Sequence, residues 1–172
     1  VVFAKKHKLK IAKIEDLISY RLKNEKLIKF ISSKKIKIKN FGNFDLKIFR
    51  NILDDSEHYS ITKGKFTSTK ASRVRVISTN VLNSFFNFKK NIFKNSLNYL
   101  TKFNNFALIL VKGSNQNTNS PENNNVLRYY GVGAQIIKEL KIKKMILVSR
   151  SKKRVIGLKG YNLKITKQEI IK

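Results

Sequence analysis

The chain has 172 residues, with 38 Lys and Arg against 10 Asp and Glu, a formal net charge of +28 and no cysteine. This length accommodates one domain with a substantial core, or one domain with an attached piece of another. No apolar run approaches the roughly 20 residues of a membrane-spanning helix, and the charged first residues do not form a signal peptide. The lack of cysteine excludes disulfides, cysteine nucleophiles and thiolate metal sites. We expect a cytoplasmic protein.

The large excess of lysine raises the question of nucleic-acid binding. Lysine is spread along the chain instead of forming one stripe, and Asn, Ile and Phe are abundant while the chain has 7 Gly and 1 Pro. This composition is typical of an AT-rich genome. We therefore expect weak, non-specific binding of RNA or DNA in vitro and no specific nucleic-acid partner.

Hydrophobic spacing in the first part of the chain predicts helices followed by a linker. Residues 1–7 have the character of a helix end, and residues 8–12 alternate like a short strand. Apolar residues at 14, 17, 18 and 22 recur at helical spacing, which predicts a helix to about Lys29. The polar residues 32–35 are the predicted linker. The chain is thus divided into residues 1–31 and residues 32–172.

From residue 36 the hydrophobic period becomes two, which predicts strands. Strands are expected at 36–38, 44–48, 57–63 and 73–77, with a turn at 54–56, so that the middle forms a largely antiparallel sheet. A helix over 83–103, a buried strand over 106–111 and a mobile polar loop over 113–125 follow. A helix through Val132, Ile136 and Leu140 and strands at 145–148 and 163–165 complete the pattern. The fold class is α+β or α/β, a mixed sheet with flanking helices.

Two stretches of the chain resemble one family of riboflavin-biosynthesis proteins. Residues 3–11 (FAKKHKLKI) and 14–21 (IEDLISYR) are similar to the last helices of 3,4-dihydroxy-2-butanone 4-phosphate synthase. Residues 57–58 (EH), 63–64 (KG), 73–76 (RVRV), 130–135 (YGVGAQ) and 157–161 (GLKGY) resemble GTP cyclohydrolase II, in the order of that family. The resemblance implies a synthase tail, residues 1–31, before a GTP cyclohydrolase II-like domain, residues 32–172. Because the chain begins with Val1, we expect a fragment of a longer protein.

The resemblance implies a zinc enzyme, whereas the residues here do not supply the zinc ligands. GTP cyclohydrolase II opens the guanine imidazole ring with a zinc-activated water and releases formate and pyrophosphate. The family's His-Ser-Glu-Cys stretch corresponds to residues 77–80 (ISTN), and its Cys-x-Cys pair falls near Asn91 and Phe93. A family segment with an acidic-glycine-arginine motif is replaced by the polar loop 113–125. We expect that zinc and catalysis are lost and that this segment holds no cofactor, with magnesium needed only by the upstream synthase domain.

A few residues still match the nucleotide site of the family. Arg128 matches a family arginine, but the acid of that Asp-x-Arg motif is Val126 here, so Arg128 is a vestigial match and no catalytic residue is expected. Four residues are candidate substrate-binding residues by resemblance: Arg75, Ser78, Ser149 and Lys153. A basic turn such as 149–153 binds an anion when it precedes a helix, whereas strand alternation favours a solvated face for Arg75.

Two smaller groups of residues have structural interpretations. Gly131 and Gly133 are expected to allow helix entry and close packing. His7 and His58 are too few for a histidine-only metal site.

These observations leave three hypotheses. The first is a non-catalytic domain that is structural or regulatory for an upstream synthase, which converts ribulose 5-phosphate to butanone phosphate and formate; its partners are that synthase domain and a second copy in a homodimer. The second is a metal-independent enzyme, or a module that binds a nucleotide or phosphate ligand, in the old GTP pocket around Arg128, Ser149 and Lys153. The third is a basic nucleic-acid-binding protein, and the Phe residues at core-period positions argue against it. No membrane partner is expected.

Overall fold

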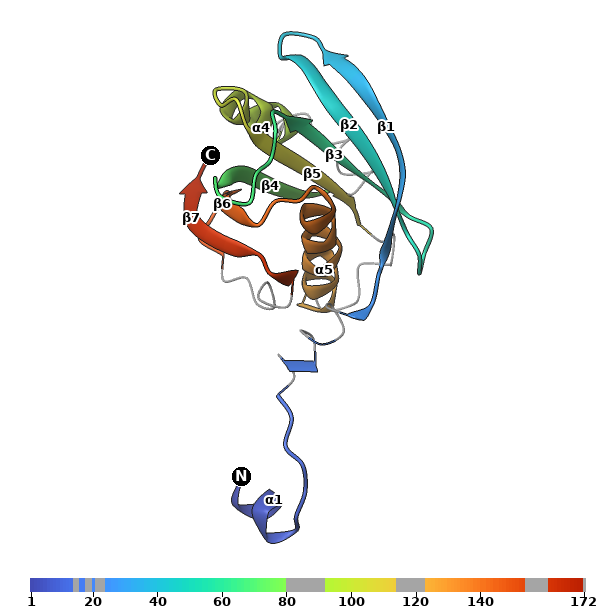
Figure 1. The fold of residues 1–172 in the computed structure, drawn as a ribbon, viewed down its shortest axis with the longest axis vertical. Helices are drawn as coiled ribbons and strands as arrows, with labels where there is room; N and C mark the ends of the chain where they lie inside the picture. Colours follow the sequence, from blue (N-terminus) through green and yellow to red (C-terminus); the bar gives the residue numbers. More distant parts are fainter. Residues whose placement is uncertain are drawn as a thin grey trace.

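The computed structural model describes residues 1–13, 16–17, 20, 24–79, 92–113, 123–153 and 161–171. Its strands are β1 (Ile28–Ile38), β2 (Gly42–Asn51), β3 (Glu57–Lys63), β4 (Ser72–Thr79), β5 (Phe106–Lys112), β6 (Lys144–Ser149) and β7 (Lys164–Ile170). Its helices are α1 (Val2–Lys6), α4 (Ile92–Leu100) and α5 (Asn123–Glu139). The α+β or α/β class predicted from the sequence is confirmed (Figure 1).

The described strands form one sheet in the order β1-β2-β3-β5-β4-β6-β7. The half from β1 to β5 is antiparallel, whereas β4 pairs in parallel with both β5 and β6, and β6 pairs in parallel with β7. The prediction of a largely antiparallel middle is therefore wrong for β4. A parallel pair needs a crossover connection, and α4 and α5 lie in the two connections that leave β4 and β5.

The two helices cover opposite faces of the sheet, which explains why the central strand β5 is buried on both of its faces (Figure 1). On the α5 face, Val74 and Ile109 pack with Ile136 of the helix. On the α4 face, Leu108 packs with Leu97 and Leu100 of that helix. Since β5 has a helix on both sides, its residues 106–109 are all fully buried. Each fully buried Leu, Ile or Val stabilises the fold by about 1.5–3 kcal/mol.

The N-terminal segment contradicts several predictions. Residues 8–12 do not form the predicted strand, because the chain turns at Lys8 with a φ of 51° and the Leu9 N–H donates to the Ala4 carbonyl. The predicted helix does not extend to Lys29, since helical residues end at Asn24 and β1 begins at Ile28, which is 1% exposed and pairs with Asn51. This segment extends away from the body of the molecule (Figure 1).

The predicted linker at residues 32–35 is wrong, because these residues lie inside β1 and pair with residues 45–48 of β2. Their polar composition has a different cause: β1 is the edge strand, and residues 30–35 are exposed on both faces. Lysine on an edge strand discourages pairing with another chain. The proposed division between residues 31 and 32 falls within this strand.

The remaining elements follow the predictions more closely. The strands at 57–63 and 106–111 and the turn at 54–56 are confirmed, the turn by Asp54, whose carboxylate accepts the Ser56 N–H. The predicted helix over 83–103 is confirmed as α4 for its second half, and residues 80–91 lie outside the described residues. The polar loop was predicted too long, because α5 begins at Asn123; residues 114–122 are outside the described part.

One contact anchors the beginning of β1 to α5 across more than a hundred residues of sequence. The buried Gln135 accepts the Leu27 N–H with its Oε1 at 2.8 Å and donates its Nε2 to the Glu25 carbonyl at 2.7 Å. Beside it, the Ile52 N–H donates to the Leu27 carbonyl at 2.9 Å. The backbone that leads into the sheet is therefore held by side-chain and backbone partners before the first strand begins.

Candidate functional site

The carboxyl ends of β4, β5 and β6 lie at one edge of the sheet because these strands are parallel. The helix that follows β4 in the chain, α4, packs on one face of the sheet, and the helix that follows β5, α5, packs on the other, so the two connections lead to opposite faces. In open α/β sheets, ligands bind outside the carboxyl ends of strands where connections diverge in this way. The turn 149–153 follows β6 at the same edge and therefore lies where such a ligand would bind.

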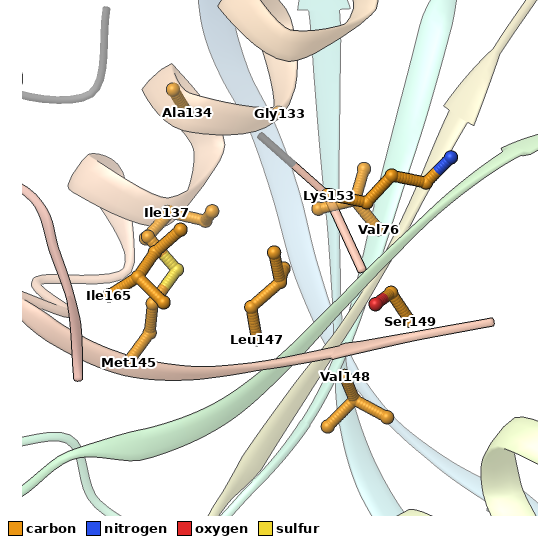
Figure 2. Close-up of a pocket in the computed structure, with 10 residues that line it drawn as sticks. All are labelled: Val76, Gly133, Ala134, Ile137, Met145, Leu147, Val148, Ser149, Lys153 and Ile165. Atoms are coloured by element: carbon orange, nitrogen blue, oxygen red, sulfur yellow. The ribbon is translucent and has the colours of Figure 1, made fainter. Parts of the chain in front are cut away.

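A cavity of about 90 Å³ lies between α5 and the sheet near this edge (Figure 2). On one side it is lined by Gly133, Ala134 and Ile137 of α5, and on the other by Met145, Leu147 and Ile165 of β6 and β7. In Figure 2 the Leu147 side chain rises from its strand into this space, while Val148 points to the opposite side of the strand. The interior is therefore apolar.

Gly133 and the end of the β4–β6 pairing lie at the border of this cavity. A Cβ atom on Gly133 would lie 3.3 Å from Cγ1 of Val76, so the helix approaches β4 closely at that point. The close packing predicted for Gly133 is confirmed, whereas helix entry is not its role, because α5 begins at Asn123. The register between β4 and β6 ends at Val74 and Leu147, so Val76 and Ser149 lie beyond the paired part.

Among the described residues that line the cavity, Ser149 and Lys153 are the polar ones. The Ser149 hydroxyl donates to the Ser151 carbonyl at 2.7 Å. The Gln168 side chain accepts the Lys153 N–H at 2.9 Å and donates to the Lys153 carbonyl at 2.8 Å. The backbone of the turn is thus fixed without the Lys153 side chain, whose ammonium group points away from the apolar lining (Figure 2).

Arg75 lies on the other face of the sheet and is only 4% exposed, so the predicted solvated position is wrong. Strand alternation places Arg75 with Arg73 and Ile77 on the face that α4 covers. Its Nε and Nη1 atoms are buried and have no hydrogen-bond partner. Burial lowers the pKa of the Arg75 guanidinium, and the positive charge of Arg150 lowers it further. A buried cation beside a second cation is an arrangement that a bound anion would stabilise.

Arg73, two residues earlier on the same face, has the partners that Arg75 lacks. Its guanidinium donates to both carboxylate oxygens of Glu169, at 2.9 and 3.2 Å, and lies 3.4 Å from the ring centroid of Phe103. The Tyr99 hydroxyl donates to the same carboxylate at 2.8 Å. Arg73 therefore joins β4, β7 and the end of α4, and its charge is satisfied within the fold.

The four candidate residues do not converge on one point. Ser149 and Lys153 lie together at the cavity, Ser78 is exposed on the α5 face, and Arg75 is buried on the α4 face. Arg128 lies in α5, in the stretch whose side chains are outside the described part. Sequence reasoning missed Arg150, although alternation from Ser149 places it on the face of Arg75. It also missed Gln168, since nothing local links that residue to Lys153.

The residues present do not fit the zinc ion that the resemblance implies. The chain has no cysteine, and among its described residues no group of three or more His, Asp or Glu side chains is arranged to hold a metal. His58 is 1% exposed, and both of its ring nitrogens have partners within the fold. Its Nδ1 accepts the Lys112 N–H at 3.1 Å, and its Nε2 lies 3.3 Å from the Ser56 hydroxyl. Burial lowers the pKa of His58, and the negative charge of Asp54 offsets only part of this effect. His58 therefore fixes the carboxyl end of β5.

Comparison with known proteins gives the family. The sequence profile of GTP cyclohydrolase II matches residues 29–109 and 94–169, which together cover most of the chain. The chain belongs to the GTP cyclohydrolase II family. This assignment agrees with the mixed sheet described above, and it begins within one residue of β1.

The relatives of this GTP cyclohydrolase II-family chain are proteins of riboflavin biosynthesis. A 3,4-dihydroxy-2-butanone 4-phosphate synthase of Photobacterium phosphoreum is 31% identical over 95% of this chain and 49% of the relative. The riboflavin biosynthesis protein RibBA of Aquifex aeolicus is 27% identical over 99% of this chain and 48% of the relative. The crystal structure of RibBX, a two-domain 3,4-dihydroxy-2-butanone 4-phosphate synthase from A. baumannii, matches with a TM-score of 0.66 and 28% identity, over 99% of this chain and 48% of that one.

The chain thus spans about half the length of the relatives that it matches. Of the helices that the structure describes, none has the length and hydropathy that crossing a bilayer requires.

Proposed function

We propose that this chain is a GTP cyclohydrolase II-type domain without GTP cyclohydrolase activity, in a protein whose other half is a 3,4-dihydroxy-2-butanone 4-phosphate synthase. The proposal depends on the absence of the family's zinc ligands. In this family cysteine side chains hold the zinc, and this chain contains no cysteine. Fold and site are separate sets of residues, so the packed sheet persists when the ligands are lost. The role that remains is structural or regulatory toward the synthase half.

The full-length protein tests this proposal directly. We expect it to convert ribulose 5-phosphate to butanone phosphate and formate in the presence of magnesium, and to leave GTP unchanged with or without added zinc. Formate release from each substrate measures both activities in one assay. Turnover of GTP above the background of a heat-denatured sample would refute the loss of catalysis, and an inactive synthase half would refute the assignment of the parent protein.

A second function, the binding of a phosphate-bearing ligand at the carboxyl edge, is favoured by Arg75. The guanidinium is buried, its Nε and Nη1 have no partner, and Arg150 is its charged neighbour. Burying a charged group without a counter-charge is costly. When one partner of a buried ion pair is removed, the protein loses about 3–5 kcal/mol of stability. A bound anion would recover part of that cost, which is how a regulatory ligand would stabilise the domain.

Thermal unfolding with pyrophosphate tests this second function. We expect pyrophosphate to raise the melting temperature of the full-length protein, and Arg75→Met to abolish the shift without lowering the melting temperature in its absence. Arg50→Met is the matched control, because Arg50 is an exposed arginine paired with Glu57 at 3.5 Å. An equal loss of the shift in both variants would mean that pyrophosphate binds only to the general positive charge.

A further inference from the structure

We infer that the cavity between α5 and β6 binds a small amphipathic anion: a compact apolar group inside the cavity, joined to an anionic headgroup beside Lys153. This cavity lies on the α5 face of the sheet, so the site is separate from the anion site proposed around Arg75 on the α4 face. The anchoring residues are Lys153 for the headgroup and Leu147 and Ile137 for the apolar group.

The volume of the cavity limits the size of the apolar group that it can hold. A single water needs about 10–15 Å³ of such a cavity, and an engineered apolar cavity of about 150 Å³ binds benzene. A cavity of about 90 Å³ is too large for one water and suits a group of roughly four to six carbons. Its interior offers water few hydrogen-bond partners, because Ile137, Met145 and Leu147 supply hydrocarbon and sulfur surfaces.

The position of Lys153 favours a ligand whose headgroup carries a negative charge. Its aliphatic stem borders the apolar space, and its ammonium group extends outward at the exposed end (Figure 2). Gln168 holds both the N–H and the carbonyl of Lys153, so the position of this residue does not depend on a ligand. A cation carried on a fixed backbone at the end of an apolar cavity favours ligands that have both an apolar group and a negative charge.

The test compares three probes on the full-length protein by methyl NMR of the cavity residues and by calorimetry. Phenyl phosphate has a ring and a headgroup, inorganic phosphate has only the headgroup, and benzyl alcohol has a ring without charge. We expect phenyl phosphate to shift the methyl resonances of Ile137 and Leu147 saturably, and to bind about tenfold more tightly than inorganic phosphate. If phosphate binds as tightly as phenyl phosphate, the apolar requirement is wrong; if neither probe shifts the Ile137 and Leu147 resonances, the inference fails, whereas the anion site at Arg75 is tested separately by pyrophosphate.

Two pairs of variants separate a built site from general attraction to the basic chain. Lys153→Gln should weaken phenyl phosphate binding about tenfold while keeping the backbone bonds to Gln168, and Lys152→Gln, an exposed neighbour, should leave it unchanged. Leu147→Phe should fill the cavity and abolish ring-dependent affinity, with Leu46→Phe on β2, remote from the cavity, as the control for a changed core. Equal weakening by the two lysine variants would overturn the inference.

Discussion

Replacing Gln135 by methionine should destabilise the domain measurably, because this amide is the buried contact that holds the start of β1 to α5. Methionine has nearly the same volume and cannot reproduce the two hydrogen bonds. The Leu27 N–H, which is partly buried, would lose its acceptor at 2.8 Å, and the Glu25 carbonyl would lose a donor at 2.7 Å.

The magnitude follows from the number and burial of these bonds. A hydrogen bond of this kind contributes about 0.5–1.5 kcal/mol net, so the loss of both should lower the free energy of unfolding by roughly 1–3 kcal/mol. Gln168→Met is the matched control, because Gln168 makes the same pair of bonds to the backbone of Lys153, but in positions open to solvent. Water can replace those bonds, so Gln168→Met should lower the free energy of unfolding by less than about 0.5 kcal/mol.

Urea unfolding of the two variants and the parent chain measures the difference, with an unchanged dependence on urea concentration showing that the same structure unfolds. Hydrogen exchange gives an independent readout, since the Leu27 amide should lose protection in Gln135→Met and keep it in Gln168→Met. If Gln135→Met lowers the free energy of unfolding no more than Gln168→Met does, burial of the Gln135 contact does not increase its contribution to stability, and the reasoning is refuted.

The remaining predictions concern one ion pair, one histidine and one glycine. Burial alone would raise the pKa of Glu169, but hydrogen bonds from Arg73 and Tyr99 outweigh it and lower the pKa, so Glu169→Gln should cost roughly 1–3 kcal/mol near neutral pH. That difference should disappear on acidification through the lowered pKa, as urea titrations at several pH values would reveal. His58, whose pKa burial lowers, is held neutral, so wild-type stability should decline as pH falls below the ordinary histidine range, and His58→Gln should remove that slope. Gly64→Ala should cost about 1–3 kcal/mol, because φ is +81° and the new Cβ would overlap the Asn104 carbonyl; Gly42→Ala, with φ of +103° and open space, should cost less by the same unfolding assay.

Parts of the candidate site were predictable because they follow from local pattern. The basic turn 149–153 is visible as a run of serine and basic residues after an apolar strand, and the structure places Ser149 and Lys153 together at a cavity. Arg75 was predicted to face solvent, because alternation tells which residues share a face and not what covers that face. The helix α4, which lies across that face, is what buries it.

The sequence by itself determined the positions of most strands, the family and the lack of thiolate ligands. Hydrophobic period and residue type are properties of a short stretch of chain, and they survive without knowledge of any partner. The tertiary structure decided what depends on partners far away in sequence. It made residues 32–35 an edge strand instead of a linker, because β2 was available to pair with them. It paired β4 in parallel, buried Arg75 without a counter-charge, and joined Gln135 to Leu27. Each of these outcomes requires two segments to meet, and no local pattern encodes such a meeting.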